Sequence, residues 1–365
     1  FSCERCVQKG NFTNGKITYP SLECDLRCHD SYVEFNDKNH QLMKSPLLAL
    51  KGIDFIYSIP LDYMHMACLG IMKNLLNRWI RERRSTFALK QSFITLISNK
   101  MENMSTLAPH EFTRIPRGFQ NFEKWKATEF RFFMLYAGPV VLLESLSNRL
   151  YRNFMYLHYA MRIVCSDKLI IKYGEKAILY IKKFCLGLIQ LYGEEMMVYN
   201  AHSIYHLVQD AVREQLSVHK YSCFPFESYL GQILKLVTAP VQPLQQIACR
   251  LDEIKYKTEI GDLGLNVHKN AEGLIEFINF KGYKIYPQRE NDRYVLFQNQ
   301  QVMKVDSIIE ENKEHFCKGS LFNSSSTFYK KNVFDLHFLK IGDLSTYKFK
   351  VNINEMITKC IIIKQ

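Results

Sequence analysis

The period of the hydrophobic pattern changes once along this chain, and that change limits its fold more than any other feature. Up to residue 257, apolar residues recur every three or four positions, which is the period of an amphipathic helix. Within residues 128–193, where three such stretches follow one another, short connections favour antiparallel neighbours. Seven stretches show the pattern, at residues 62–84, 129–148, 151–165, 170–192, 203–216, 226–237 and 243–257.

The last hundred or so residues show a different pattern. From about residue 267, short alternating runs are separated by Asn, Gly, Asp and Ser, as at 282–286, 294–297 and 302–305. Period-two alternation between turn residues is typical of strands in an antiparallel sheet. The sequence therefore predicts a small antiparallel β domain at 263–365. Residues 1–50 have neither period, and we expect an irregular segment that needs a metal or another domain to hold it.

Composition excludes several classes of protein. No run of eighteen apolar residues occurs, so we expect no membrane span. The 48 Lys and Arg exceed the 36 Asp and Glu, a net charge of +12 that favours a polyanionic partner, although the charge is spread along the chain. Eleven cysteines, an odd number in a long chain, indicate reduced thiols in the cytosol or nucleus. The chain starts at Phe1 without a charged-then-apolar leader, so we expect a piece of a longer polypeptide.

A pair of cysteines two residues apart opens the chain. Cys3 and Cys6 have the spacing at which two thiolates bind one Zn²⁺ from a tight turn, so two further ligands are needed. A local alternative is Cys24 with Cys28, which completes a spacing close to that of a zinc ribbon. A remote alternative is His202 with His206, which share one face of a helix. Spacing alone favours the four cysteines.

Three further features offer polar side chains for chemistry. Asp62 and His65 lie at a predicted helix start, where a carboxylate and an imidazole can either cap the helix or enter a site. Glu227 lies in the first turn of another helix, which suits the helix dipole or a metal. The basic stretch 77–84 suits a solvated helix end or phosphate. We find no Walker loop, GxGxxG, nucleophile elbow or HExxH, which argues against nucleotide-dependent enzymes, common hydrolases and zincins.

Several short motifs follow one another along residues 1–255: Cys3 with Cys6, residues 45–48, 60–65, 69–70, 129–133, 136–139, 156–158, 200–207 and 224–230, and Gln245, Gln246 and Arg250. Taken in order, they resemble the catalytic region of CACTA-type (En/Spm-like) DNA transposases. The resemblance implies an α/β fold, with part of an RNase H-like core and a large α-helical insertion, mostly helical overall. Its implied domains are 1–75 with a Cys-rich loop, 76–200 as the insertion, 201–262 as closing helices, and 263–365 as the β domain.

The resemblance also implies a chemistry. Such enzymes hold two Mg²⁺ or Mn²⁺ ions with two Asp and one Glu, and cut and join DNA phosphodiesters by in-line attack. Glu227 is implied as the closing carboxylate, and the two catalytic Asp are expected upstream of Phe1, with Asp62 as a minority alternative for the second. Asp62 and His65 match a family motif that is expected to support the active site. This chain alone is therefore expected to be inactive as a nuclease.

A structural zinc is implied as well. The layout is similar to that of the catalytic subunit of V(D)J recombinase, a relative at the level of fold, in which a Cys pair and a downstream His pair share one zinc. The resemblance thus favours Cys3, Cys6, His202 and His206 as ligands. It implies transposon-end DNA as partner, a nuclear location and a homo-oligomer. The alternative is an inactive, zinc-stabilised DNA- or chromatin-binding module domesticated from a transposase.

Overall fold

The computed structural model describes residues 2–38, 40–104, 107–112, 114, 117–255, 265–323, 325–328 and 339–363. Its elements form two compact units, each drawn from two segments of the chain. Unit 1 comprises Phe1–Asn99 and Pro116–Tyr229, and unit 2 comprises Lys100–Ile115 and Leu230–Gln365. The fold is mixed α/β. The sequence-based boundary at 262–263 lies outside the described residues.

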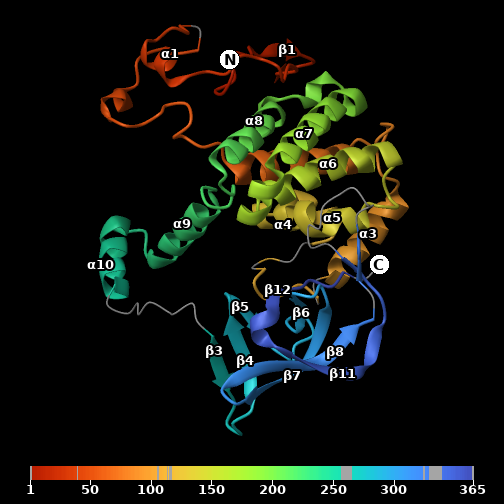
Figure 1. Ribbon diagram of the computed structural model, residues 1–365. Helices are drawn as coiled ribbons and strands as arrows, with labels where there is room; N and C mark the ends of the chain where they lie inside the picture. The colour runs from red at the N-terminus through yellow and green to blue at the C-terminus, as the bar shows by residue number, and fades with distance from the viewer. Residues whose placement is uncertain are drawn as a thin grey trace. The chain divides into compact units, whose positions relative to one another are not determined.

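Unit 1 is mainly helical, and its helices follow the predicted periodicity closely. Helix α7 packs between α6 and α8 (Figure 1). The stretch predicted as one helix at 62–84 is a π-helix, η2, continued by α2, and the stretch 129–148 is α4, η4 and α5. The helices are η2 (Met64–Met72), α2 (Lys73–Arg81), α3 (Gln91–Met104, which continues into unit 2), η3 (Phe119–Lys124), α4 (Ala127–Phe132), η4 (Phe133–Ala137), α5 (Gly138–Val141), α6 (Asn148–Val164), α7 (Asp167–Tyr192), η5 (Glu194–Met196) and α8 (Tyr199–Glu214).

The first fifty residues are irregular, as predicted. They contain the hairpin β1 (Asn11–Thr13) and β2 (Lys16–Thr18), the short helix α1 (His29–Val33) and the turn η1 (Pro46–Ala49). Asn14 and Gly15 both have positive φ, as a tight two-residue hairpin turn requires. In the described part of unit 1 the sheet is this hairpin alone. An RNase H-like core is therefore not confirmed.

The core of unit 1 is built from large aromatic side chains. Trp79 of α2 is fully buried, donates to the Tyr192 hydroxyl at 2.8 Å and contacts Phe154 edge to face. His158, also fully buried, pairs through Nδ1 with the carbonyl oxygen of Met134 at 2.9 Å, and burial lowers its pKa to about 3. This imidazole is thus a neutral core residue.

Unit 2 contains the predicted β structure, with antiparallel pairing throughout its described strands. Its larger sheet has the order β11-β8-β7-β6-β12, and a smaller one has the order β3-β4-β5. The apolar side chains of Val295, Phe297, Met303 and Met356 form its core. The elements are α9 (Phe224–Leu236, which begins in unit 1), α10 (Pro243–Lys255), β3 (Asn266–Lys269), β4 (Ile275–Phe280), β5 (Tyr283–Ile285), β6 (Tyr294–Phe297), β7 (Val302–Glu311), β8 (Glu314–Phe322), β9 (Ser325–Thr327), β10 (Leu339–Ile341), β11 (Leu344–Asn352), η6 (Ile353–Glu355) and β12 (Met356–Lys359).

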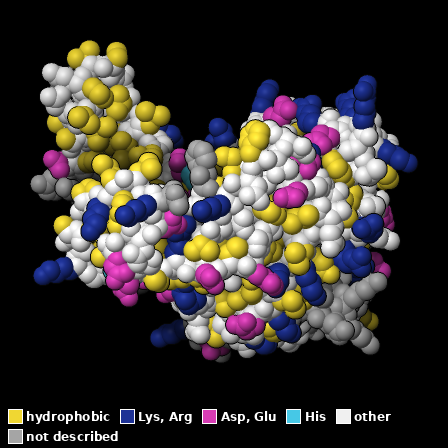
Figure 2. Space-filling model, turned by 90° about the horizontal axis from the view of Figure 1, so that it is seen from above, with side chains coloured by type: hydrophobic (Ala, Val, Ile, Leu, Met, Phe, Trp, Pro, Cys, Tyr) yellow, Lys and Arg dark blue, Asp and Glu magenta, His cyan; other side chains and the backbone are white. Residues whose placement is uncertain are grey.

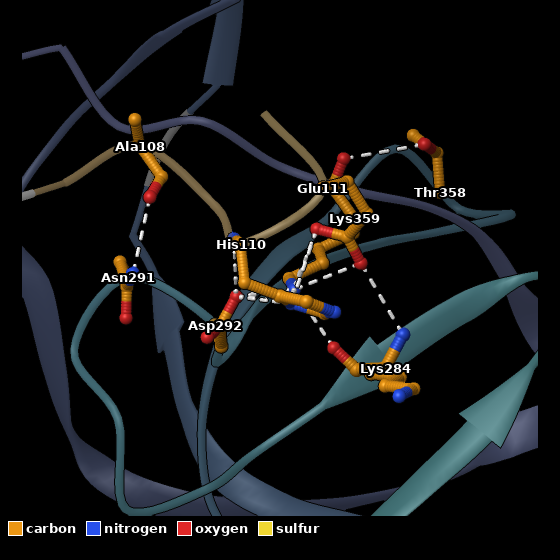
Figure 3. A network of polar contacts seen from close by, with 8 residues as sticks. All are labelled: Ala108, His110, Glu111, Lys284, Asn291, Asp292, Thr358 and Lys359. Atoms are coloured by element: carbon orange, nitrogen blue, oxygen red, sulfur yellow. Dashed lines mark hydrogen bonds and ion pairs between the residues drawn. The ribbon is translucent and has the colours of Figure 1, made fainter. Parts of the chain in front are cut away.

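A buried ammonium group joins the segment after α3 to the strands of unit 2 (Figure 3). Lys359 Nζ donates to Asp292 Oδ1, to both carboxylate oxygens of Glu111 at 3.0 and 3.1 Å, and to the carbonyl oxygen of Lys284 at 2.7 Å. The side chains of Lys359 and Asp292 are 2% and 1% exposed. Because a buried charge is costly without its partner, this pair must stay intact for unit 2 to fold.

We expect Lys359→Met to lower the free energy of unfolding of unit 2 by roughly 3–5 kcal/mol, because it leaves Asp292 buried and uncompensated. Urea denaturation followed by circular dichroism measures the change. The double variant Lys359→Met/Asp292→Asn should recover part of the loss. The control Lys350→Met breaks an exposed pair with Glu311 and should cost less than about 1 kcal/mol. Equal losses in both single variants would contradict the prediction.

Candidate metal centre

Two cysteines near the start of the chain and two histidines of α8 converge in unit 1. The side chains of Cys3, Cys6 and His202 are fully buried, and His206 is 2% exposed. One donor atom from each lies within 4.8 Å of all the others. Cys6 Sγ is 3.3 Å from His202 Nε2, and the two Nε2 atoms are 3.1 Å apart. The ligand set favoured by the resemblance is therefore brought together.

The outward ring nitrogens determine which tautomer each imidazole adopts. His202 Nδ1 lies 3.2 Å from the carbonyl oxygen of Tyr19, and His206 Nδ1 lies 3.0 Å from Gln209 Oε1. Both partners are acceptors, so both Nδ1 atoms donate and both Nε2 atoms carry lone pairs. Two lone pairs 3.1 Å apart repel unless a cation lies between them. Outer hydrogen bonds of this kind are the usual support of metal-binding histidines.

The two thiols also favour a cation. A hydrogen bond from Cys6 outweighs the opposing effect of burial and holds the pKa of Cys3 well below its usual range. The hydrogen bond to Cys3, together with burial, raises the pKa of Cys6 well above its usual range. One thiolate thus opposes formation of a second. A divalent ion with a preference for sulfur and nitrogen removes that conflict, and the Cys₂His₂ donor set fits tetrahedral Zn²⁺.

Arg5, between the two cysteines, gives the chain start a second attachment to α8. Its side chain is 4% exposed, and Nε donates to Asp210 Oδ2 at 2.8 Å. Its Nη2 donates to the carbonyl oxygen of Ile59 at 2.6 Å. Nothing in the spacing of the cysteines indicated this role. The backbone N–H of Arg5 also donates to Cys3 Sγ at 3.3 Å, which stabilises the thiolate form of a ligand.

The local four-cysteine alternative is not assembled. Cys24 is partly exposed and donates through Sγ to Gln8 and Ser21, and Cys28 is exposed. Neither belongs to any group of possible metal ligands among the described residues. The spacing that favoured these cysteines reflects distance along the chain only. In the fold, Cys3 and Cys6 face the His pair of α8 instead of Cys24 and Cys28.

Asp62 lies where the sequence placed it, at the start of η2, and it connects two helix starts. Its Oδ2 accepts from the backbone N–H of His65 at 2.9 Å and pairs with His65 Nδ1 at 2.5 Å. Its Oδ1 accepts from the backbone N–H of Cys223, the residue before α9, at 2.8 Å. Burial opposes ionisation, but the N–H groups of Cys223 and His65 outweigh it and lower the pKa of Asp62.

Glu227 is exposed in the first turn of α9 and is not grouped with Asp62. The donors that the structure places together are instead Asp62, His65 and Cys223. Cys223 directly precedes the motif 224–230, and nothing in the sequence singled it out. Glu129, another residue of the recognised motifs, is buried and forms a bidentate ion pair with Arg117 at 2.8 and 2.9 Å, which gives it a structural role.

Comparison with known proteins adds no relative. No family model, curated protein or solved structure matches this chain. None of the helices described combines the length and the apolarity needed to cross a lipid bilayer.

We expect Cys3→Ser and His202→Ala each to lower the zinc content of the purified protein by the same one equivalent, because both remove a ligand of one ion. Atomic absorption after gel filtration measures it. The matched control Cys24→Ser should keep the wild-type content. Loss with Cys24→Ser but not with His202→Ala would instead establish the four-cysteine site.

Proposed function

We propose that this chain is the C-terminal part of the catalytic region of a CACTA-type DNA transposase, or of a protein derived from one, acting on DNA in the nucleus. One observation carries the proposal. The Cys pair converges with the His pair of α8, and Glu227 lies in the first turn of the next helix, 21 residues after His206. The donor types, their order and their convergence are those that the transposase resemblance implies.

The surroundings of Glu227 suit a carboxylate that binds metal together with carboxylates from elsewhere in the parent protein. It is exposed, and the ligand groups among the described residues do not include it. Two-metal phosphodiester chemistry needs several carboxylates around both ions, so one Glu does not suffice. We infer that the two Asp come from an RNase H-like sheet elsewhere in the parent protein, with Mg²⁺ or Mn²⁺ held jointly.

The apolar face of α9 supports that inference. Phe226, Leu230 and Leu234 recur every four residues and are 66%, 58% and 72% exposed. Large apolar side chains in such a row are ordinarily covered by another element. The sheet of an RNase H-like core is the element that the proposal assigns to this face.

A second candidate is an inactive, zinc-stabilised DNA- or chromatin-binding module. The observation in its favour is that Asp62, the one alternative catalytic Asp in this sequence, pairs with His65 and Cys223 rather than with Glu227. Both candidates predict DNA binding, and they differ in whether the parent protein cuts DNA.

The exposed arginines that follow α2 are the phosphate contacts we propose. Arg83 and Arg84 are exposed next to Arg81 at the helix end. Figure 2 shows Lys and Arg spread among acidic and hydrophobic side chains on the face in view. A local cluster is therefore a better test of DNA binding than net charge.

We expect duplex DNA to bind with an affinity that falls steeply with salt. The variant Arg83→Ala/Arg84→Ala should weaken binding at all sequences and reduce the slope of log affinity against log salt by about 2, since each phosphate contact contributes about 0.9. Fluorescence anisotropy at salt concentrations from roughly 50 to 200 mM measures the affinity and its slope against salt. Lys44→Ala/Lys51→Ala, at two exposed lysines of the first segment, is the matched control. Equal slopes for both double variants would contradict the assignment.

In the full-length parent, Glu227→Ala should reduce Mg²⁺-dependent cleavage of transposon-end DNA about 100-fold or more, because a metal ligand is lost. DNA affinity should stay unchanged. Glu175→Ala, at an exposed carboxylate of α7, is the control and should retain cleavage. A parent that binds but never cleaves supports the second candidate, and cleavage that survives Glu227→Ala rejects the role of Glu227.

A further inference from the structure

A second group of possible metal ligands lies in unit 1, made of residues that the zinc centre does not use. Asp62 precedes η2, His65 lies in its first turn, and Cys223 precedes α9. Each offers one donor atom, an oxygen, a nitrogen and a sulfur, and these atoms lie within 4.8 Å of one another. Two segments about 160 residues apart in the chain are needed to bring them together.

The backbone holds the carboxylate of this group in place. The N–H groups of His65 and Cys223 donate to its two oxygens at 2.9 and 2.8 Å. These bonds fix the direction of both oxygens from two elements at once. Such support around a ligating carboxylate is a regular property of metal sites, because a ligand that does not need to reorient loses less entropy on binding.

The two segments are also packed firmly against each other. Tyr63, fully buried, lies 6.0 Å from Phe224 and 5.4 Å from His219 between ring centroids. Arg131 of α4 stacks over the Phe224 ring at 5.3 Å. The starts of η2 and α9 are thus joined by aromatic contacts beside the three donors, which therefore stay together whether or not an ion binds.

No ammonium or guanidinium group of the described chain forms an ion pair with this cluster. Among the described residues, the ion pair that Asp62 forms is with His65. The group His110, Glu111 and Asp292 of unit 2 is different, because Lys359 Nζ contacts all three residues. That group already holds a cation of its own, whereas the Asp62 group does not.

The donor types select the kind of ion. Sulfur and nitrogen are poor ligands for Mg²⁺ and Ca²⁺ and good ones for Zn²⁺ and its neighbours in the first transition row. A carboxylate and a thiolate balance the charge of one divalent ion. A thiol nucleophile is the competing use of these residues, but the position of all three donor atoms within 4.8 Å of one another favours a shared ion.

We propose that Asp62, His65 and Cys223 bind a second divalent transition-metal ion of the zinc class. The ion displaces the thiol proton of Cys223 to solvent, and the proton shared by Asp62 Oδ2 and His65 Nδ1 is exchanged for one on His65 Nε2, so that the imidazole binds as a neutral ligand. Three protein ligands leave a fourth position for water or another oxygen donor. His65 is 56% exposed, so that position opens toward solvent. The ion joins the start of η2 to the start of the helix that carries Glu227.

Metal titration tests this proposal without any assay of DNA cleavage. The metal-depleted protein, titrated with Co²⁺ and then dialysed, should retain two equivalents, with absorption bands of thiolate-bound cobalt. His65→Ala and Cys223→Ser should each retain one, with a loss of affinity at the second site at least as large as the roughly 10–100-fold caused by outer-ligand changes. Cys249→Ser, at an exposed cysteine of α10, is the matched control and should retain two.

Two further outcomes keep the test decisive. In the Cys3→Ser background a single equivalent should remain, and His65→Ala should remove it. If Cys3→Ser does not fold, His65→Ala in the otherwise unchanged chain decides alone, because an exposed side chain can be removed with an unchanged circular dichroism spectrum. Retention of one equivalent by the wild type, or equal retention by wild type and His65→Ala, would overturn the proposal and leave the transposase proposal untouched.

Discussion

The fold of unit 1 depends on the meeting of two pairs of donor atoms from opposite ends of that unit. Cys6 and His202 are 196 positions apart and yet in direct contact. The first fifty residues have strands of three residues and one five-residue helix, so their own packing is slight. Closing so long a loop costs little more than closing a short one, about 0.6 kcal/mol per doubling, whereas a structural zinc contributes on the order of 10 kcal/mol. A metal is therefore sufficient to attach this segment to α8.

The helix η2 connects α8 to other helices of the unit. It contacts α2, α4 and α8, and at Gly70 it approaches α8 so closely that a Cβ atom would lie 2.6 Å from Asn200 Nδ2. Asp62 at its start accepts the N–H that precedes α9. The helix with the His pair and the start of the helix with Glu227 are thus both attached to η2. Stretches of π-helix inside α-helices often occur at functional sites. This one contains His65 of the second site and packs against α8, which carries the His pair.

Clusters of the same residue types have different roles in this protein, depending on which cation they meet. In unit 2, Lys359 lies among His110, Glu111 and Asp292, and the cluster stabilises the fold. In unit 1, the cysteines and histidines face one another with lone pairs, and no Lys or Arg side chain in the described part of the unit bonds to them. Residue types alone therefore identify only candidate metal sites. A cluster with a Lys ammonium group at its centre is a structural ion-pair cluster, whereas a cluster with a metal ion at its centre is a metal site.

The sequence by itself determined the local structure and the kinds of donor available. Two patterns depend only on neighbours in the chain and could be predicted without a structure. They are the helical period of α6, α7 and α8 and the alternation of the β strands. Helix α3 was missed, and so were the roles of Arg5, Cys223 and Lys359, because each depends on a partner far away in the sequence. The choice of His202 over Cys24 as the partner of Cys6 likewise depends on contacts between residues far apart in the sequence. Spacing favoured the cysteines, but the packing of α8 against the chain start decided which donors meet, since a metal site responds to distances in space.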